Sequence, residues 1–431
     1  MKLTLGLLFA GLFVICGLAE ERGFSGEWLV TLDLYGTPTY ARWKVTEKDG
    51  HYKTHFFGFD LDGTVKGDSI EFTCTQDEDG AVKPCGKAVG ALSGDEMRGS
   101  GKLGDLDVTW SARRAAASSG APQTRDFAPS HYYRQFNGNT EPVLHLNPGD
   151  TVRTKCVDAG GKDATNTTRS LGGNPLTGPF YIDTAWPGDT LVVHLSRVRL
   201  NRDSAGIFND SVVAGALEPY YVRDMKRPKD FDSSWKLDRE AGTATLTKAT
   251  DPLKDFKVAM HPMLGCIGVA PPNRQAFQAG NLGRYGGNMD YNQVREGVTL
   301  YLPVFQPGAL LFVGDGHATQ GDGELTGNAL ETSMDVEFTV DLIRGKSLGQ
   351  PRFENSDYVM VSGIAGSLDD ALRMATTGLS RWLEQEYKLN AGEIAMVLGS
   401  SMQYDIAEVV DPQVHVVAKL NKAVLAQIKK P

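Results

Sequence analysis

The sequence predicts a mainly β protein with an α/β element at its C-terminal end. The 431 residues include 49 Gly and 20 Pro without a fixed period, a composition that favours many turns. Short β-prone runs separated by Gly-containing turns recur through most of the chain. Apolar residues at three- and four-residue spacing, which indicate an amphipathic helix, occur in the C-terminal part.

Length and composition limit the classes of protein that fit. A prior of roughly 150 residues per domain suggests two or three domains. With 41% hydrophobic and 23% charged residues, the chain can bury a sizeable core. The formal charge is −9 and no run of Lys or Arg stands out, so nucleic-acid binding lacks its electrostatic driver.

Residues 1–19 have the pattern of a signal peptide. Lys2 precedes an apolar run from Leu3 to Leu18, and small residues suit cleavage after Ala19. The run is short for a membrane span. We therefore expect an exported protein, periplasmic or extracellular and free of the membrane after cleavage. A lipoprotein built on Cys16 and a retained anchor are the alternatives.

Residues 20–114 are expected to form a small accessory β domain, a barrel or meander filled by its own side chains. Its β-prone runs are Trp28–Leu32, Tyr40–Val45, Ser69–Phe72 and a closing strand Trp110–Arg113. Cys74 and Cys85 flank a polar turn, so we expect them to form a disulfide in a hairpin. Cys156 and Cys266 are expected to be buried free thiols.

A linker at 115–125 leads to the main unit, 126–431, predicted as a jelly-roll-like β-sandwich with an α/β part. Two Pro-Gly-Asp-Thr segments, 148–151 and 187–190, read as turns that lead into strands. Residues 218–258 look like an insertion, with 243–248 as an edge strand.

The C-terminal part is predicted to contain helices. Ser367, with Asp370 three residues later, fits the cap of a helix about 20 residues long. A second helix is expected to begin at 391–393, β structure at 409–417, and a final helix at 419–429.

The densest polar cluster is the glycine-rich segment 314–324, which follows the apolar strand 308–313. It holds Asp315, His317, Gln320 and Glu324, and Glu331 follows. Imidazole and carboxylate groups suit Zn²⁺ or a similar divalent ion. The alternative is a solvated acidic hairpin. A histidine between two Asp-Gly turns, next to a buried strand, favours a site.

Three further segments are candidates. His261 precedes a Gly-containing stretch with Cys266, where a thiol nucleophile would need the imidazole to fold back over an extended segment. Gly286–Asp290 offers Asn288 and Asp290 beside two glycines, and Asp158 is followed by two glycines after another strand.

Several of these motifs occur in one order that resembles the acetamidase/formamidase family. They are Asn174–Pro179, 187–189, 261–271, Gly286–Asp290, Pro303-Val304 and 314–324, within a match over roughly 126–425. The resemblance implies hydrolysis of the C–N bond of a small linear amide to ammonia and a carboxylate. It also implies a sandwich core with an α/β element, a divalent metal and a homo-oligomer. The signal peptide and the N-terminal β domain depart from simple members.

On this basis we assign roles to the candidate residues. Metal ligands are expected to be His317, Asp315 and Asp158, holding Zn²⁺ or alternatively Ca²⁺. The general base and acid is expected to be Glu324 or Glu331. His261 is a further catalytic candidate that would stabilise the oxyanion, and Asn288, Asp290 and Gln320 would bind substrate.

Two other hypotheses remain open at this stage. The fold could be kept without catalysis, as an exported binding or scaffold protein. Alternatively, Cys266 could be a nucleophile. A carbohydrate-binding role is weaker, because the six Trp residues show no clustering in the sequence.

Overall fold

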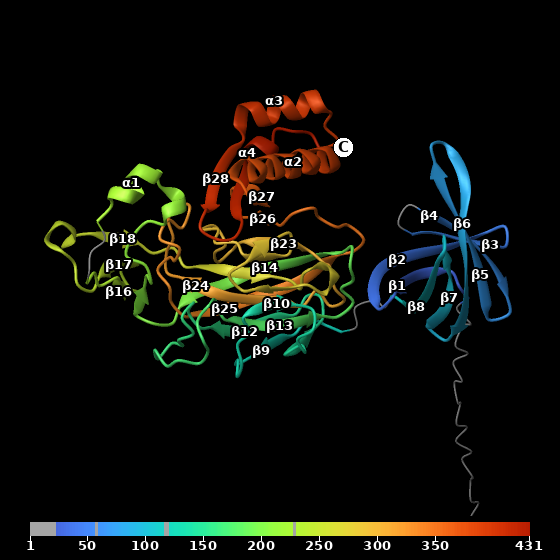
Figure 1. Ribbon diagram of the computed structural model, residues 1–431, viewed down its shortest axis with the longest axis horizontal. Helices are drawn as coiled ribbons and strands as arrows, with labels where there is room; N and C mark the ends of the chain where they lie inside the picture. Colours follow the sequence, from blue (N-terminus) through green and yellow to red (C-terminus); the bar gives the residue numbers. More distant parts are fainter. Residues whose placement is uncertain (1–22, 57–58, 116–119, 227–229) are drawn as a thin grey trace, which may run out of the picture. The chain divides into compact units, whose positions relative to one another are not determined.

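The computed structural model describes residues 23–56, 59–115, 120–226 and 230–431. The predicted signal peptide lies outside the described residues. The chain divides into two compact units, one that contains residues 43–114 and a larger one that contains 29–42 and 115–431. The eight strands before residue 115 form a closed barrel. Both units are rich in strands (Figure 1), which confirms the predicted fold class. No helix of the described chain has the length and apolar character needed to cross a membrane.

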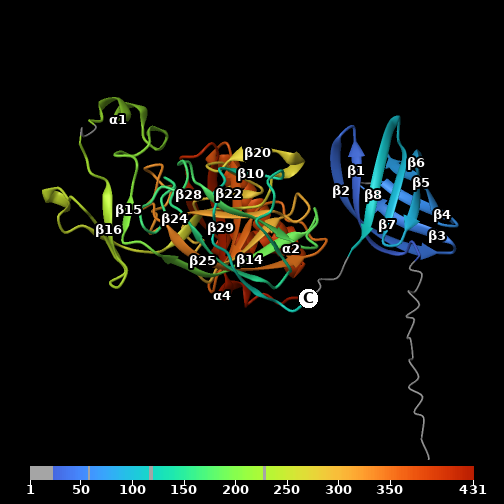
Figure 2. The ribbon, with the colours of Figure 1, turned by 90° about the horizontal axis from the view of Figure 1, so that it is seen from below.

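The barrel is the small separate β domain predicted from the sequence (Figure 2). Its strands are β1 (Gly26–Leu34), β2 (Thr37–Lys48), β3 (His51–Phe56), β4 (Phe59–Lys66), β5 (Ser69–Glu78), β6 (Ala81–Ser93), β7 (Glu96–Leu103) and β8 (Leu106–Arg114). The predicted disulfide between Cys74 and Cys85 links the hairpin β5–β6 and is confirmed.

Aromatic side chains pack inside the barrel. The ring of Trp43 lies 5.5 Å from that of Phe72 and 5.3 Å from that of Trp110, measured between centroids. Gly90 and Gly99 leave space for the Trp110 ring, since a Cβ atom would come within 2.3 Å and 2.4 Å of it. This packing supports the expectation that side chains fill the barrel.

The larger unit is a sandwich of two sheets. One sheet has the order β28-β29-β27-β26-β23-β14-β25-β12-β9 and the other β11-β13-β24-β19-β22-β21. Buried side chains of both sheets form one core, in which Phe180 of β13 contacts Phe338 of β25 with ring centroids 5.2 Å apart. Strands that bury both faces explain the apolar runs in the sequence.

The bounds of the sandwich strands are as follows. The first sheet contains β9 (Thr124–Asp126), β12 (Thr151–Cys156), β14 (Thr190–Leu200), β23 (Thr299–Pro303), β25 (Met334–Ile343), β26 (Arg352–Glu354), β27 (Tyr358–Ala365), β28 (Gln403–Glu408) and β29 (Val414–Asn421). The second contains β11 (Leu144–Leu146), β13 (Leu176–Ile182), β19 (Met263–Gly268), β21 (Leu282–Gly283), β22 (Gly286–Asn288) and β24 (Leu311–His317).

Two smaller sheets complete the larger unit. One pairs β10 (Gln135–Asn137) with β20 (Ala276–Gln278), and the other has the order β15 (Ser204–Gly206), β16 (Ser234–Asp238), β17 (Thr243–Leu246) and β18 (Lys257–Ala259). The insertion also carries α1 (Pro219–Asp224) and the short 3₁₀ turns Ala214–Ala216 and Asp251–Leu253, and a third, Pro272–Arg274, precedes β20. The prediction that 243–248 is an edge strand is wrong, because β18 pairs with the side of β17 that faces away from β16.

The two predicted Pro-Gly-Asp-Thr turns lead into β12 and β14, as expected. In each turn the aspartate is fully buried and accepts backbone N–H groups. Asp150 accepts from Gln123 at 2.7 Å and Asn147 at 3.0 Å, and Asp189 accepts from Trp186 at 3.0 Å. The carboxylates therefore satisfy turn amides that would otherwise be buried without partners.

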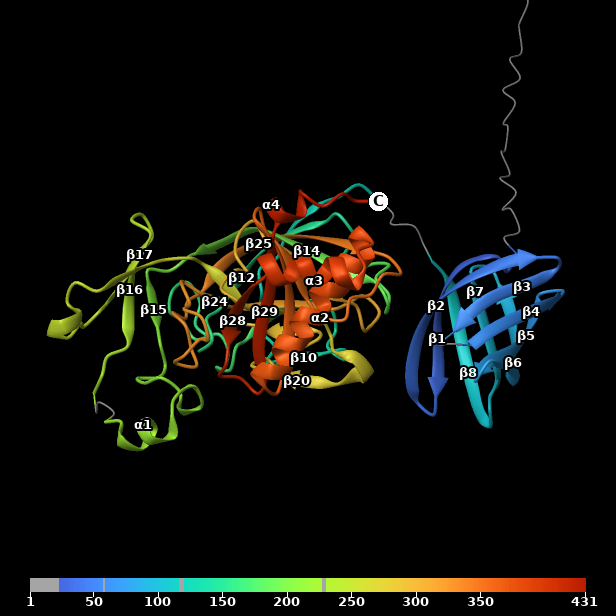
Figure 3. The ribbon, with the colours of Figure 1, turned by 90° about the horizontal axis from the view of Figure 1, so that it is seen from above.

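The C-terminal helices cover the sheet formed by β27 and β29 (Figure 3). The helix α2 (Leu368–Tyr387) begins after Ser367, whose side chain accepts from the N–H of Asp370, so the predicted cap and length are confirmed. The helix α3 (Ala391–Ser401) confirms the second prediction and begins with a capping box built on Asn390.

The prediction for the last residues is partly wrong. The β structure expected at 409–417 begins only at Val414, and the final helix expected at 419–429 is reduced to α4 (Lys422–Leu425). The strand β29 extends to Asn421 because it pairs with β27 along its whole length and with β28 on its other side. Tertiary pairing here outweighs the helical preference of the local sequence.

His415 on β29 joins this element to the core. Its ring is fully buried, with Nδ1 2.7 Å from the carbonyl oxygen of Met289 and Nε2 2.9 Å from the hydroxyl of Ser362. The Nδ1–H therefore donates to Met289, and Nε2 accepts from Ser362. Burial lowers the pKa of His415 to about 4.

This buried imidazole predicts a pH-dependent loss of stability. The unfolded chain protonates His415 near pH 6.5, whereas the folded chain resists until about pH 4. The contribution of His415 to the free energy of unfolding is thus fully present above pH 6.5. It decreases by up to about 3 kcal/mol as the pH falls to 4. Urea unfolding of wild type and His415→Gln at several pH values should show the difference between them shrinking over that range. A constant difference would contradict the prediction.

Candidate active site

The centre of the site lies on the strand β24. Asp315 and His317 belong to the strand itself, so the expectation that they follow it in a loop is wrong by a few residues. Residues two positions apart on a strand point to the same face, which brings both side chains together. Asp315 adopts a left-handed backbone conformation, with φ of 56°, a strained arrangement that clusters at functional sites.

The buried ring of His317 is held in one orientation by Gln320. Nδ1 lies 3.0 Å from Oε1 of Gln320, whose Nε2 donates to the carbonyl oxygens of Asp290 and Ala407. Because the amide nitrogen is used on those carbonyls, Oε1 must accept the Nδ1–H of His317. In the neutral ring, Nε2 then carries a free lone pair. Gln320 thus positions the imidazole, and the predicted role in substrate binding is not supported.

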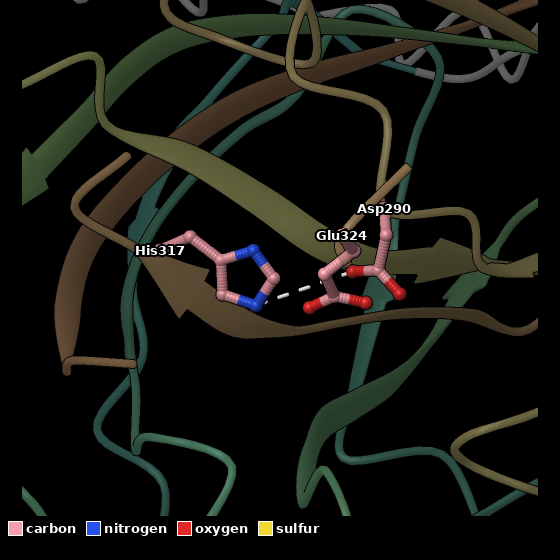
Figure 4. Close-up of side chains that lie close together, drawn as sticks. All are labelled: Asp290, His317 and Glu324. Carbon is pink, nitrogen blue, oxygen red and sulfur yellow. Dashed lines mark ion pairs between the residues drawn. The ribbon is translucent and has the colours of Figure 1, made fainter. Parts of the chain in front are cut away.

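Carboxylates from four positions surround Nε2 of His317. The nearest oxygens of Glu331, Asp315 and Asp290 lie 3.3, 3.5 and 4.0 Å away. Glu324 joins Asp290 and His317 in a second group whose ligand atoms all lie within 4.8 Å (Figure 4). The buried atoms His317 Nε2, Asp290 Oδ1, Asp315 Oδ1 and Glu331 Oε2 make no hydrogen bond.

Ionising all the buried carboxylates around His317 at once is electrostatically unfavourable. Burial raises the pKa of Asp290 and Glu324 well above their ordinary values, and neighbouring carboxylates add to this. Burial also raises the pKa of Glu331 to about 7. Burial alone would lower the pKa of His317, but Glu331 and Asp315 outweigh it and raise the value well above normal. A cation would relieve this accumulation of negative charge.

Asn288 holds neighbouring carboxylates in place and does not bind a substrate. Its Nδ2 donates to Asp290 at 2.5 Å and to Asp411 at 2.7 Å. Its Oδ1 accepts from Asn174 at 2.9 Å and from the thiol of Cys266 at 2.7 Å. All four hydrogen bonds that an amide can readily make are thus used within the protein. The prediction that Asn288 contacts substrate is therefore not supported.

The structure does not bring Asp158 or His261 into the cluster. Asp158 forms a buried ion pair with Arg202 at 2.7 Å and accepts the backbone N–H of Lys162 at 2.8 Å, so its carboxylate is already neutralised. The prediction of Asp158 as a metal ligand is corrected to a structural role. His261 is exposed just before β19, and its predicted catalytic role is likewise not supported.

Removing the Asp158 carboxylate should destabilise the fold. Asp158→Ala leaves the guanidinium of Arg202 buried without its counter-ion, which costs about 3–5 kcal/mol. Chemical denaturation checks this value. Asp224→Ala is the control, because its pair with Arg223 is exposed and its removal should leave the unfolding free energy almost unchanged. An unchanged unfolding free energy for Asp158→Ala would contradict the interpretation.

Several residues of the site were not predicted from the sequence. Gly265 lies on β19 between the ladder pairs Leu264–Gly316 and Cys266–Gly314, and a Cβ atom there would meet Asp290 Oδ1 at 2.3 Å. Asp411 comes from the segment between β28 and β29. Nothing in its Asp-Pro context distinguishes it from a turn residue. Asn174 lies in a motif of the family resemblance, but it has no local signal of its own.

Cys266 is a neighbour of the cluster and not an activated nucleophile. Burial, and then the negative charges of Asp315 and Asp290, raise the pKa of its thiol well above the ordinary value. The Sγ atom donates to Asn288 and lies 3.9 Å from Asp315. A nucleophilic cysteine requires the thiolate, which this environment disfavours. Cys156 is also buried and free, as predicted for both thiols.

Comparison with known proteins identifies the family. Residues 124–279 and 280–401 match the model of the Acetamidase/Formamidase family. The chain belongs to the acetamidase/formamidase family. The resemblance read from the sequence motifs is thereby confirmed, and with it the class of amidase, a hydrolase of small amides.

Individual relatives agree with the family assignment. The chain is 26% identical over 308 residues to a formamidase of Methylophilus methylotrophus, covering 56% of this chain and 73% of the relative. It is 28% identical over 272 residues to an acetamidase of Mycolicibacterium smegmatis, covering 50% and 66%. A crystal structure of a predicted acetamidase/formamidase from Thermoanaerobacter tengcongensis superposes with a TM-score of 0.60 at 25% identity, covering 71% of this chain and 98% of that one.

Proposed function

We propose that this protein hydrolyses the C–N bond of a small linear primary amide of the formamide or acetamide type. The products are ammonia and the corresponding carboxylate. The observation that carries the proposal is the buried Nε2 of His317, which makes no hydrogen bond and lies 3.3–4.0 Å from carboxylate oxygens of Asp290, Asp315 and Glu331. The oxygens of Asp290 and Asp315 that face it are also without hydrogen bonds. Such a cluster has no structural benefit by itself, because each unpaired buried group costs free energy.

The same atoms suit a divalent cation. One imidazole nitrogen and carboxylate oxygens from Asp290, Asp315 and Glu331 are ligand types that Zn²⁺ accepts, and the oxygen-rich set also suits Ca²⁺. Gln320 supports this interpretation, since a ligating histidine commonly donates its other N–H to an oxygen. When bound, such an ion would supply Lewis-acid polarisation of the amide carbonyl.

Glu324 is the carboxylate best placed to move protons. Glu331 accepts the backbone N–H of Ala329 at 3.0 Å, whereas the Glu324 carboxylate makes no hydrogen bond to the described residues. We assign Glu324 to take a proton from the attacking water and to deliver it to the leaving nitrogen. The water oxygen then bonds to the carbonyl carbon, the C–N bond breaks, and ammonia leaves. General acid–base groups of this kind contribute about 10²–10⁴-fold.

Ammonia release from formamide, acetamide and longer amides tests the proposal. Purified mature protein should release ammonia, lose this activity with a chelator, and contain a metal by elemental analysis. A metal-containing protein that releases ammonia from none of these amides would instead favour the exported binding or scaffold protein. Full activity in a metal-free protein would refute the assignment of the cation.

Export remains part of the proposal. The disulfide between Cys74 and Cys85 in the barrel supports it, because disulfides persist in oxidising compartments outside the cytosol. Cell fractionation that finds the protein in the periplasm or medium, without its first 19 residues, would agree. The homo-oligomer expected from the family resemblance stays a prediction.

A further inference from the structure

The segment that precedes Asp411 is fastened to the glycine-rich loop of the site. The N–H of Gly323 donates to the carbonyl oxygens of Ile406 and Ala407 at 2.9 and 3.1 Å, and the N–H of Val409 donates back to Gly323 at 3.2 Å. Gln320, which orients His317, also donates to Ala407. Hydrogen bonds donated by both segments therefore join the C-terminal α/β element to the site.

A buried glutamate shapes the turn that carries Asp411. Glu408 is fully buried, and its Oε2 accepts the N–H of Val410 at 2.9 Å and that of Asp411 at 3.1 Å. Two such bonds to consecutive amides fix the backbone of the turn. Asp411 consequently has a defined position although it lies between strands.

The carboxylate of Asp411 is placed against the catalytic cluster. Its Oδ2 accepts from Asn288 Nδ2, whose other hydrogen goes to Asp290, so the two carboxylates flank the same amide group. Asp290 is completely buried, whereas Asp411 is half-buried. Asp411 is thus the more exposed of these two carboxylates. The second oxygen, Oδ1, makes no hydrogen bond to the described residues and is available to a ligand.

We propose that Asp411 forms the subsite for the amino group of the substrate. The inference rests on the proposed amidase function and adds how the site recognises an amide. A primary amide presents two N–H donors on its nitrogen, and a carboxylate oxygen is an acceptor that matches them. An ester offers no donor at that position, and the carboxylate product carries a like charge.

Burial raises the pKa of Asp411 to about 7, so above this pH the side chain is a negatively charged acceptor. Two consequences follow from this charge at such a pH. It strengthens binding of primary amides, because hydrogen bonds to charged groups are the strong ones. It weakens binding of formate or acetate, because like charges repel in a site of low dielectric. Asp411 therefore favours the substrate over the product that replaces it.

The variant Asp411→Asn tests this subsite with little change of shape. The new side chain can still accept from Asn288 through its carbonyl oxygen, but it presents an NH₂ group without charge to the ligand. We expect KM for formamide and acetamide to rise roughly 10–100-fold, with a smaller change in kcat. Inhibition by formate or acetate should become stronger by roughly tenfold or more. Metal content and thermal stability should stay at wild-type values.

Two further variants separate recognition from structure. Asp411→Glu keeps the charge and should retain weak product inhibition even where KM rises, so it also serves if Asp411→Asn folds poorly. Asp322→Asn is the matched control, because exposed Asp322 on the same glycine-rich loop accepts from Asn292 at 2.7 Å in a similar contact. Asp322→Asn should have the KM, kcat and product inhibition of the wild type.

The outcomes distinguish the inference from the function on which it rests. Wild-type protein that releases no ammonia overturns the proposed function. Active wild type together with an Asp411→Asn variant whose KM and product inhibition are unchanged overturns the subsite alone. A fall in kcat with unchanged KM and inhibition also overturns it, since that result would assign Asp411 to the chemistry or to folding.

Discussion

Replacing His317 with alanine is expected to abolish both bound metal and amide hydrolysis. His317 supplies the nitrogen atom common to the two candidate ligand groups found among the described residues. Without it, the buried carboxylates of Asp290, Asp315 and Glu331 lose both a partner for their charge and the group that orders them. Loss of one principal electrostatic group in an active site costs about 10²–10³-fold in kcat, and loss of the cation should add to this.

The matched control for this prediction is His261→Ala. His261 is an exposed histidine before β19 and takes no part in the cluster, so its removal should leave kcat, KM and metal content unchanged. Steady-state ammonia release and elemental analysis of both variants decide the matter. A fully active His317→Ala protein would refute the site. An inactive His261→Ala protein would support the catalytic role that the sequence predicted for His261.

The sequence was sufficient for the part of the site that is local in the chain. Asp315, His317 and Glu324 lie within ten residues, and the return of the chain places Glu331 opposite His317 in an antiparallel bridge. A glycine-rich segment after a buried strand predicts such a return on physical grounds. The sandwich, the barrel and the helix after Ser367 were also predictable, because each depends on periodicity and turn residues.

The remainder depends on pairings that no local pattern records. Asp158 carried the same signal as Asp315, a carboxylate beside glycines, and only the ion pair with Arg202 separates a structural from a functional role. Asp411 reaches the cluster because β28 and β29 join the sheet of the sandwich. The register of distant strands decides both cases, and a single sequence does not specify which strands become neighbours.

Gly265→Ala should inactivate the enzyme although the residue has no side chain to lose. Gly265 lies on β19 beside the cluster. The space that a Cβ atom would need there is filled by Asp290 Oδ1 at 2.3 Å, Asp315 Oδ2 at 2.7 Å and the ring of His317 at 3.0 Å. These atoms belong to groups that are held on their other sides by Asn288 and Gln320. They cannot all move away without breaking those hydrogen bonds.

A shift of these side chains by about 1 Å is enough to lower activity about 10²-fold, because the reaction depends on their alignment. Crowding should also cost about 1–3 kcal/mol of stability. The control is Gly321→Ala on the glycine-rich loop, where a Cβ atom meets nothing within 4 Å, and it should retain wild-type activity. Measured together, kcat, metal content and the unfolding free energy separate a distorted site from a damaged fold. A Gly265→Ala protein with normal activity and full metal content would show that the cluster around His317 is not where the amide is cleaved.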